Sequence, residues 1–140
     1  MTTQNTLAAG VIGLGSMGLG MAQSIVKRGI KVAGFDINAA AVAKLVEAGG
    51  GGAASGADVA KNADVLLVVV VNAAQTDTVL FGEKGAAAAM TKGSVIISSA
   101  TMAPDDARRH AAKAEALGLW SLDAPSSGGA AKAALGQLTV

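Results

Sequence analysis

The chain has 140 residues, a formal net charge of +1 and no cysteine. This length allows one domain with its own core, and the lack of cysteine excludes disulfides, thiolate metal sites and a cysteine nucleophile. Lysine and arginine are scattered, so we expect no nucleic-acid partner. The longest apolar run, residues 65–71, is far shorter than the roughly 20 residues that span a bilayer. Because the N-terminus also lacks a signal-peptide pattern, we expect a cytoplasmic protein without a membrane segment.

Short apolar runs alternate with Ala-rich stretches in the first half of the chain. We expect a strand over 8–12, a helix over 16–27, a second strand over 30–36 and a helix over 38–48. Four consecutive glycines at 49–52 then predict a flexible connection, since glycine disfavours the interior of helices and strands.

The second half continues the same alternation. Ser55 is expected to cap a short helix to residue 62, and the run 64–71 is apolar on both faces, which is typical of a central strand in a parallel sheet. Short helices over 75–81 and 85–90, a strand over 93–99, a helix over 104–117 and a strand over 119–122 follow. This order predicts one α/β domain with a Rossmann-type, doubly wound, mostly parallel sheet and helices on both faces.

A glycine-rich motif lies between the first strand and the first helix. Gly13, Gly15 and Gly18 form G-x-G-x-x-G, in which they permit the tight turn, the approach of a pyrophosphate and close helix packing, respectively. The backbone N–H groups near Ser16 and Met17, at the positive end of the helix dipole, are suited to binding the phosphates.

An acidic residue in the expected place strengthens this interpretation. Asp36 ends the second strand 18 positions after Gly18, close to the spacing of about 20 expected for a carboxylate that binds the adenosine ribose. Because a carboxylate would repel a 2′-phosphate, NAD is favoured over NADP as cofactor. The cofactor-binding residues predicted here are Gly13, Leu14, Gly15, Ser16, Met17, Gly18, Asp36 and Ile37.

A methyltransferase is the competing nucleotide-binding hypothesis, because such enzymes also place a glycine loop after the first strand and an acid after the second. The full three-glycine spacing at the start of a long helix favours the dinucleotide.

Two motifs at opposite ends of the chain resemble one known family. The stretch "GVIGLGSMGLGMAQSIVKRG" is similar to the N-terminal motif of the β-hydroxyacid dehydrogenases, and "DAPSSGG" with "GQLTV" is similar to their substrate-binding segment, usually Asp-Ala-Pro-Val-Ser-Gly-Gly. Between them, "VVVVNAAQTDTVLFGEKG" looks most like the L-threonate dehydrogenase branch. The resemblance implies NAD(P)-dependent oxidation of the hydroxyl of a small hydroxy acid.

The resemblance also implies roles for particular residues. Val71 and Asn72 would line the cofactor cleft, and Thr101 would lie near the nicotinamide. Ser127, Gly128 and Gly129 would bind the substrate carboxylate. Two positions depart from the family pattern: Ala100 stands before Thr101 where serine is common, and Ser126 stands where valine is usual.

In the family, the catalytic lysine lies on a helix after the nucleotide domain, downstream of the substrate motif, and an all-helical second domain supplies the other wall of the site. This chain ends at Val140, before that position, so we expect no catalytic residue in it. We therefore expect residues 1–140 to be a truncated dinucleotide-binding domain, inactive alone, from a protein that forms homo-oligomers. Lys132 lies within the substrate motif's tail and is expected to be a solvated helix residue. The alternative is a non-catalytic NAD-sensing or protein-interaction module.

The remaining candidates have plain structural explanations. His110, the only histidine, is expected at the surface or partly packed, and Trp120 is expected in the core. Asp105 and Asp106 suit the positive end of a helix, and Asp64 and Asp123 are expected at strand ends. No His, Asp and Glu cluster has the spacing of metal ligands, so we expect no metal.

Overall fold

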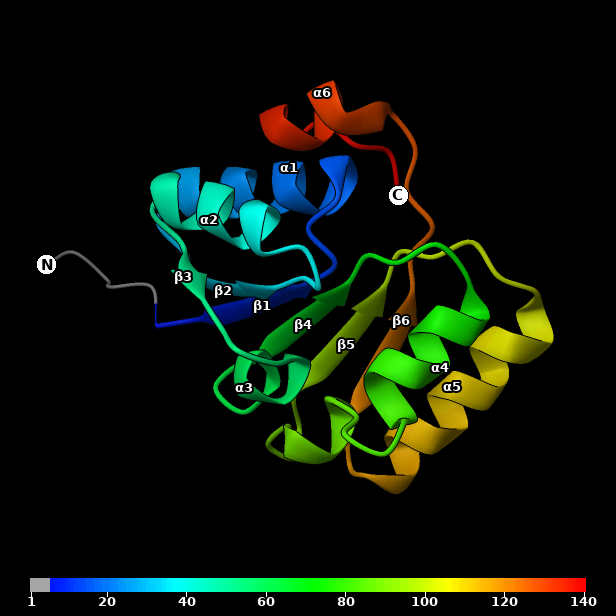
Figure 1. Ribbon diagram of the computed structural model, residues 1–140. Helices are drawn as coiled ribbons and strands as arrows, with labels where there is room; N and C mark the ends of the chain where they lie inside the picture. The colour runs from blue at the N-terminus through cyan, green and yellow to red at the C-terminus, as the bar shows by residue number, and fades with distance from the viewer. Residues whose placement is uncertain (1–5) are drawn as a thin grey trace, which may run out of the picture.

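The computed structural model describes residues 6–140, in which six strands form one sheet (Figure 1). The strands are β1 (Ala8–Ile12), β2 (Lys31–Phe35), β3 (Gly51–Gly52), β4 (Val65–Val68), β5 (Val95–Ser98) and β6 (Trp120–Asp123). They lie in the order β3-β2-β1-β4-β5-β6, and every neighbouring pair is parallel. Ile12 is in register with Phe35 and Val68, so the carboxyl ends of the three central strands meet at one edge.

Helices cover both faces of the sheet and confirm the expected doubly wound fold. On one face lie α1 (Ser16–Lys27), α2 (Ala39–Glu47) and α6 (Gly129–Leu135); on the other lie α3 (Gly56–Ala60), α4 (Ala73–Phe81), α5 (Pro104–Ala116) and the 3-10 turn η1 (Ala87–Ala89) (Figure 1). No helix in residues 6–140 is long and apolar enough to cross a membrane.

The core consists of two apolar clusters, one on each side of the sheet, and the strands divide between them with a period of two. Leu66, Val68 and Ile96 are buried in the cluster under α3, α4 and α5. Val11 and Val32 belong to the second cluster, which α1 and α2 cover. Because successive side chains of a strand point to opposite faces, the apolar run at β4 supplies both clusters.

The prediction of a flexible connection at residues 49–52 is wrong for Gly51 and Gly52, although Gly49 and Gly50 do lie between α2 and the next strand. Gly51 and Gly52 form β3, an edge strand in register with Ala33 and Gly34 of β2. A side chain at Gly52 would lie 2.9 Å from Val42 of α2, so small residues let the helix approach this edge. The backbone ladder, rather than any side-chain propensity, holds these glycines in the sheet.

The prediction that Trp120 is a core residue is also wrong, because its side chain is 71% exposed. Trp120 begins β6, which is the edge strand of the sheet, and Leu122 in the same strand is 55% exposed. An apolar groove of about 400 Å³ borders this strand and is lined by Leu67, Ile97 and Leu122 on the face that α1 and α6 cover only in part.

His110 is buried rather than at the surface, so that prediction is wrong as well. The residue is 3% exposed and lies in α5 against α4, with its ring centroid 5.9 Å from that of Phe81. Its Nε2 lies 3.1 Å from a carboxylate oxygen of Asp77. An isolated histidine in a polar stretch of sequence gave no sign of this because its burial depends on α4, which is distant along the chain.

The carboxylate of Asp77 makes the stability of this region dependent on pH. The bidentate contact with the Arg109 guanidinium, and then His110, hold the pKa of Asp77 well below its ordinary value. A carboxylate with a lowered folded-state pKa stabilises the fold above its unfolded-state pKa of about 3.9, and this stabilisation is lost as the pH falls below that value.

We predict that Asp77→Asn lowers the free energy of unfolding at pH 7 and that the difference from the unsubstituted chain shrinks below about pH 4, where the unfolded carboxylate takes up its proton. Denaturant unfolding followed by circular dichroism from pH 7 to pH 3 measures this. Asp105→Asn is the control, since Asp105 is highly exposed and pairs with Arg108 one turn away. A deficit of Asp77→Asn that grows toward acid would contradict the prediction.

Candidate functional site

A cleft of about 690 Å³ opens at the carboxyl edge of the sheet, beside β1 and β4. Strand order reverses between these two strands, and open α/β sheets bind ligands at such a point. Three segments line the cleft: the β1–α1 loop, the end of β2, and the β4–α4 connection with the first turns of α4.

The β1–α1 loop can adopt its path only with glycine at two positions. Gly13 has a φ of +95°, and a side chain there would overlap the carbonyl oxygen of Val69. A side chain at Gly18 would overlap the carbonyl oxygen of Gly13. In contrast, a Cβ at Gly15 would meet no atom within 4 Å, and Gly15 lines the cleft. The first and third glycines therefore serve packing, and the second leaves room for a ligand.

The first turn of α1 offers hydrogen-bond donors directly after Gly15, which lines the cleft; Ser16 itself lines an adjoining pocket that shares Gly15. The N–H groups of Ser16 and Met17 have no acceptor among residues 6–140, and this first turn contains no acidic residue. Unpaired N–H groups at the positive end of a helix bind anions such as a pyrophosphate. Two N–H groups of the loop before them are already paired: Gly13 donates to Phe35 O at 3.0 Å and Leu14 donates to Asp36.

Asp36 connects the glycine loop to the end of β2. One carboxylate oxygen accepts from the N–H of Leu14 at 2.7 Å, and the other accepts from the N–H of Asn38 at 2.8 Å. Each oxygen keeps a further lone pair for a ribose hydroxyl. The side chain of Ile37, which is 97% exposed, lies beside it at the mouth of the cleft. The contact with Leu14 was missed by sequence reasoning, which assigned Asp36 only to a ligand.

The β4–α4 connection is fixed by two reciprocal hydrogen bonds. The Asn72 side chain caps α4 by accepting from the N–H of Gln75 at 2.9 Å, and the Gln75 side chain accepts from the N–H of Val71 at 3.0 Å. This arrangement resembles a capping box. It holds Val71, which is 76% exposed, at the cleft wall.

Gln75 and Thr78 also line the cleft and were missed by sequence reasoning. Their spacing from Val71 in the sequence could have indicated that they line the cleft. Residues three or four apart share one face of a helix, so a helix that starts after Val71 presents both toward the same side.

The structure does not bring every predicted residue to this cleft. Thr101 is exposed in the loop that follows β5 and does not line the cleft. Ser127, Gly128 and Gly129 are exposed at the start of α6, where Ser127 exchanges backbone hydrogen bonds of 2.9 and 3.0 Å with Thr139. The φ values of Gly128 and Gly129, 133° and 76°, explain why two glycines stand there.

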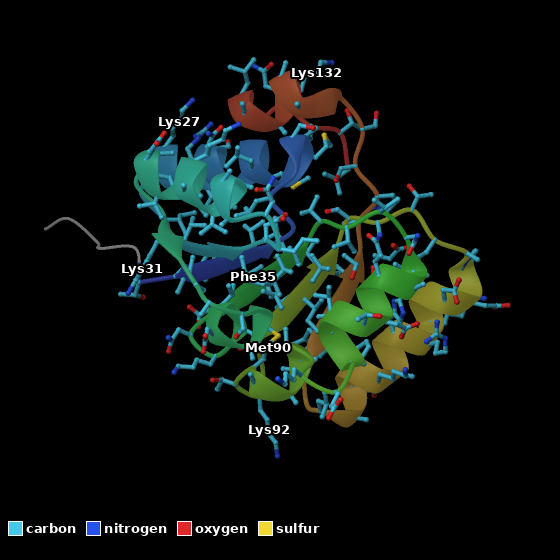
Figure 2. All side chains as sticks on the ribbon, in the orientation of Figure 1. Lys27, Lys31, Phe35, Met90, Lys92 and Lys132 are labelled. Atoms are coloured by element: carbon cyan, nitrogen blue, oxygen red, sulfur yellow. The ribbon has the colours of Figure 1, made fainter. Side chains whose placement is uncertain are left out.

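The packing of α6 on α1 determines the position of the segment that contains Ser127, Gly128 and Gly129. A Cβ at Gly20 of α1 would lie 2.8 Å from the Cβ of Ala133 in α6, so the two helices are in close contact. The hydroxyl of Ser126 donates to Ala124 O at 3.1 Å and is therefore used within its own loop. Lys132 is exposed on α6, at the periphery of the molecule (Figure 2).

The fold and the cleft together define a dinucleotide-binding domain of Rossmann type. A family model described as the NAD binding domain of 6-phosphogluconate dehydrogenase matches residues 8–140. The L-threonate dehydrogenase of Cupriavidus necator is 47% identical over 131 residues, which cover 94% of this chain and 44% of that protein. The enzyme of the same name from Escherichia coli O6:H1 is 47% identical over 141 residues, covering 100% of this chain and 47% of that protein.

A solved structure agrees with these relatives. The crystal structure of a 3-hydroxyisobutyrate dehydrogenase from Salmonella typhimurium superposes with a TM-score of 0.91 at 46% identity, covering 95% of this chain and 46% of that one. The chain thus belongs to the NAD-binding domain family of 6-phosphogluconate dehydrogenase and the β-hydroxyacid dehydrogenases, and it spans about half the length of the curated relatives it matches. The resemblance stated from the sequence motifs is confirmed.

The different roles of Gly15 and Gly18 can be separated by substitution. We predict that Gly15→Ala changes the free energy of unfolding by less than about 0.5 kcal/mol, since its Cβ meets no protein atom. The same change should raise the Kd for NADH about 10-fold or more because the added methyl group occupies space needed by the pyrophosphate. Titration calorimetry and denaturant unfolding measure the two quantities.

Gly18→Ala is the matched comparison. Its Cβ would overlap the Gly13 carbonyl oxygen, so we expect a loss of about 1–3 kcal/mol in the free energy of unfolding. Equal stability losses in the two variants, or a Gly15→Ala chain that binds NADH normally, would contradict this division of roles.

Proposed function

We propose that this chain is the cofactor-binding half of an NAD-dependent dehydrogenase that oxidises the hydroxyl group of a small hydroxy acid. The observation that carries the proposal lies at the carboxyl edge of the sheet. There the Asp36 carboxylate and Gly15 line the cleft, and the N–H groups of Ser16 and Met17, which have no acceptor among residues 6–140, follow Gly15 directly. The family assignment supports NAD(P) binding, and a relative named L-threonate dehydrogenase supports a substrate of the hydroxy-acid class.

The residues present fit a dinucleotide. Gly13, Leu14, Gly15, Ser16, Met17 and Gly18 would hold the pyrophosphate, Asp36 and Ile37 would contact the adenosine ribose and its surroundings, and Val71 and Asn72 would form the wall opposite. Of these residues, Gly13, Gly15, Asp36, Ile37, Val71 and Asn72 line the cleft. Bound NAD supplies the hydride acceptor. The open space at Gly15 is where a phosphate can approach the backbone.

The substrate segment would act as an orienting element. Ser127, Gly128 and Gly129 are exposed, and the Ser127 hydroxyl and the N–H groups of the two glycines would bind the substrate carboxylate. Thr101, in the loop after β5, would lie on the nicotinamide side. A proton acceptor for the substrate hydroxyl would come from a lysine outside residues 1–140, so this piece would bind cofactor without turning over substrate. The dehydrogenase relatives do not favour the alternative of a non-catalytic NAD-sensing module.

The complete protein would carry a further helical domain and act in the cytoplasm as a homo-oligomer. The support for this part is the family resemblance together with the length of the relatives, of which this chain covers 44% and 47%.

We predict that the chain binds NADH at least about 10-fold more tightly than NADPH, because Asp36 would lie close to the 2′-phosphate and like charges repel. Asp36→Ala should weaken NADH binding, since it removes an acceptor for the ribose and releases the N–H of Leu14. The same substitution should also bring the Kd for NADPH closer to the Kd for NADH. Titration calorimetry at one fixed salt concentration measures all four affinities.

S-Adenosylmethionine is the control ligand in the same titrations. Binding of this compound without binding of NADH would favour a methyltransferase and overturn the proposal. If the unsubstituted chain binds NADH and NADPH with equal affinity, the dinucleotide site still stands. The proposal that Asp36 makes the site prefer NAD would then be wrong.

A further inference from the structure

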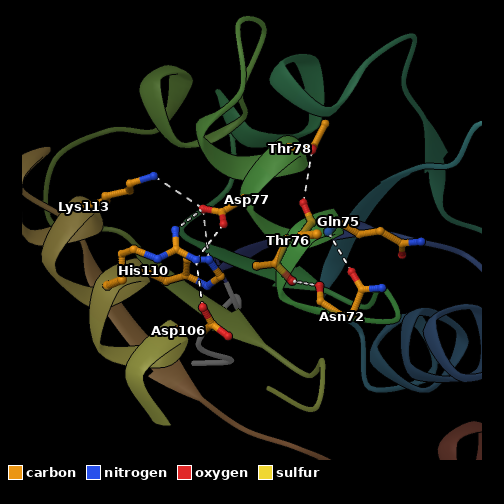
Figure 3. A network of polar contacts seen from close by, with 10 residues as sticks. Asn72, Gln75, Thr76, Asp77, Thr78, Asp106, His110 and Lys113 are labelled. Atoms are coloured by element: carbon orange, nitrogen blue, oxygen red, sulfur yellow. Dashed lines mark hydrogen bonds and ion pairs between the residues drawn. The ribbon is translucent and has the colours of Figure 1, made fainter. Parts of the chain in front are cut away.

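The helix α4 forms one wall of the cofactor cleft and is held from its opposite side by charge. Gln75 and Thr78 line the cleft, while Asp77, between them in sequence, faces α5 (Figure 3). Residues 75 and 78 lie on one face of a helix, and residue 77 lies on another. The wall of the cleft and the anchor of the helix therefore lie on different faces of α4.

Asp77 is the centre of a network of polar contacts from α5. Its two carboxylate oxygens bind the Arg109 guanidinium in a bidentate manner, with both N–O distances 2.8 Å. The ammonium of Lys113 lies 3.4 Å away and Nε2 of His110 lies 3.1 Å away. Arg109 also binds Asp106 at 3.0 Å (Figure 3). Bidentate pairs of this kind are directional as well as strong, so they fix the geometry between two helices.

The burial of His110 shows that this junction is tightly packed. Its side chain is 4% exposed, and within residues 6–140 neither ring nitrogen has a partner in good hydrogen-bond geometry. Phe81, one turn after Asp77, lies against the same ring, and the Lys113 ammonium is 5.3 Å from the Phe81 ring centroid. A shift of α4 would break the Arg109 contact and disturb these packed groups together.

Apolar packing holds the last turn of α4 in addition to this anchor. In α4 the buried residues are Thr76 and Leu80, and Leu80 belongs to the core cluster against which Val79 and Phe81 also pack. Thr76 bonds to the carbonyl oxygen of Asn72 within its own helix at 2.9 Å, so its hydroxyl does not connect α4 to a neighbour. The caps at Asn72 and Gln75 fix the start of the helix locally, and the contacts of Asp77 fix its body against α5.

We propose that Asp77 is a positioning residue for the cofactor: through Arg109, Lys113 and His110 it holds α4 against α5 and thereby sets the cleft wall formed by Gln75 and Thr78. Asp77 does not touch the cleft, and its effect on binding passes through the helix. The proposal rests on cofactor binding in this cleft. In this proposal, a carboxylate outside the cleft determines how wide the cleft is on the side of α4.

The test compares Asp77→Asn, Asp77→Glu and the control Asp105→Asn, all in the 140-residue chain. Asn keeps the size of the side chain and removes its charge, and Glu keeps the charge. We expect Asp77→Asn to raise the Kd for NADH and for AMP by about 3- to 10-fold, the size of effect that residues remote from a ligand exert through a shared element. Asp77→Glu should recover most of the affinity, and Asp105→Asn should leave it unchanged. Titration calorimetry is done well below the Tm of each variant, with circular dichroism confirming that each is folded.

The outcomes separate this inference from the proposed function. An unsubstituted chain that binds neither NADH nor AMP overturns both. A chain that binds them, with a lower Tm but an unchanged Kd in Asp77→Asn, shows that Asp77 is structural only and overturns the positioning role. If Asp77→Glu binds NADH no more tightly than Asp77→Asn does, the charge of residue 77 does not position α4, and that part of the proposal is overturned.

Discussion

The close approach of α1 to the end of β1 is the constraint on which the rest of the site depends. Gly18 reaches the carbonyl oxygen of Gly13 without a side chain between them, and this sets where the first turn of α1 presents its N–H groups. The same helix accepts α6 at Gly20, so the Ser127 segment depends on it as well. One helix therefore connects the phosphate-binding turn with the segment proposed to hold substrate.

The two walls of the cleft are stabilised by different kinds of interaction. On the β2 side, Asp36 uses both oxygens on backbone N–H groups of Leu14 and Asn38, which makes the wall a direct extension of the loop. On the β4 side, helix α4 is held by its capping residues, by the burial of Leu80 in the core and by Asp77. The first wall is built from backbone geometry, whereas the second also involves the charge of Asp77, whose contribution depends on pH and salt.

Much of the fold could be predicted from the sequence because its signals are local. The strand of residues 8–12 and the helix of residues 16–27 match the structure, since a buried strand, a glycine turn and a helix that ends before a glycine each have their own pattern. Gly51 and Gly52, Trp120 and His110 were misjudged because their states depend on partners distant in the chain: a neighbouring strand, an uncovered sheet edge and a facing helix. Similarly, no local pattern shows that Asp36 binds Leu14 or that Asp77 binds Arg109.

The central claim is that the glycine loop, Asp36 and the start of α4 together bind a dinucleotide. An NMR titration of the isotope-labelled chain with NADH tests it most directly, because each backbone N–H reports its own surroundings. We expect the largest shifts at Gly15, Ser16, Met17, Ile37 and Val71. Shifts concentrated in the apolar groove beside Leu122, with the N–H groups of Ser16 and Met17 unaffected, would contradict it.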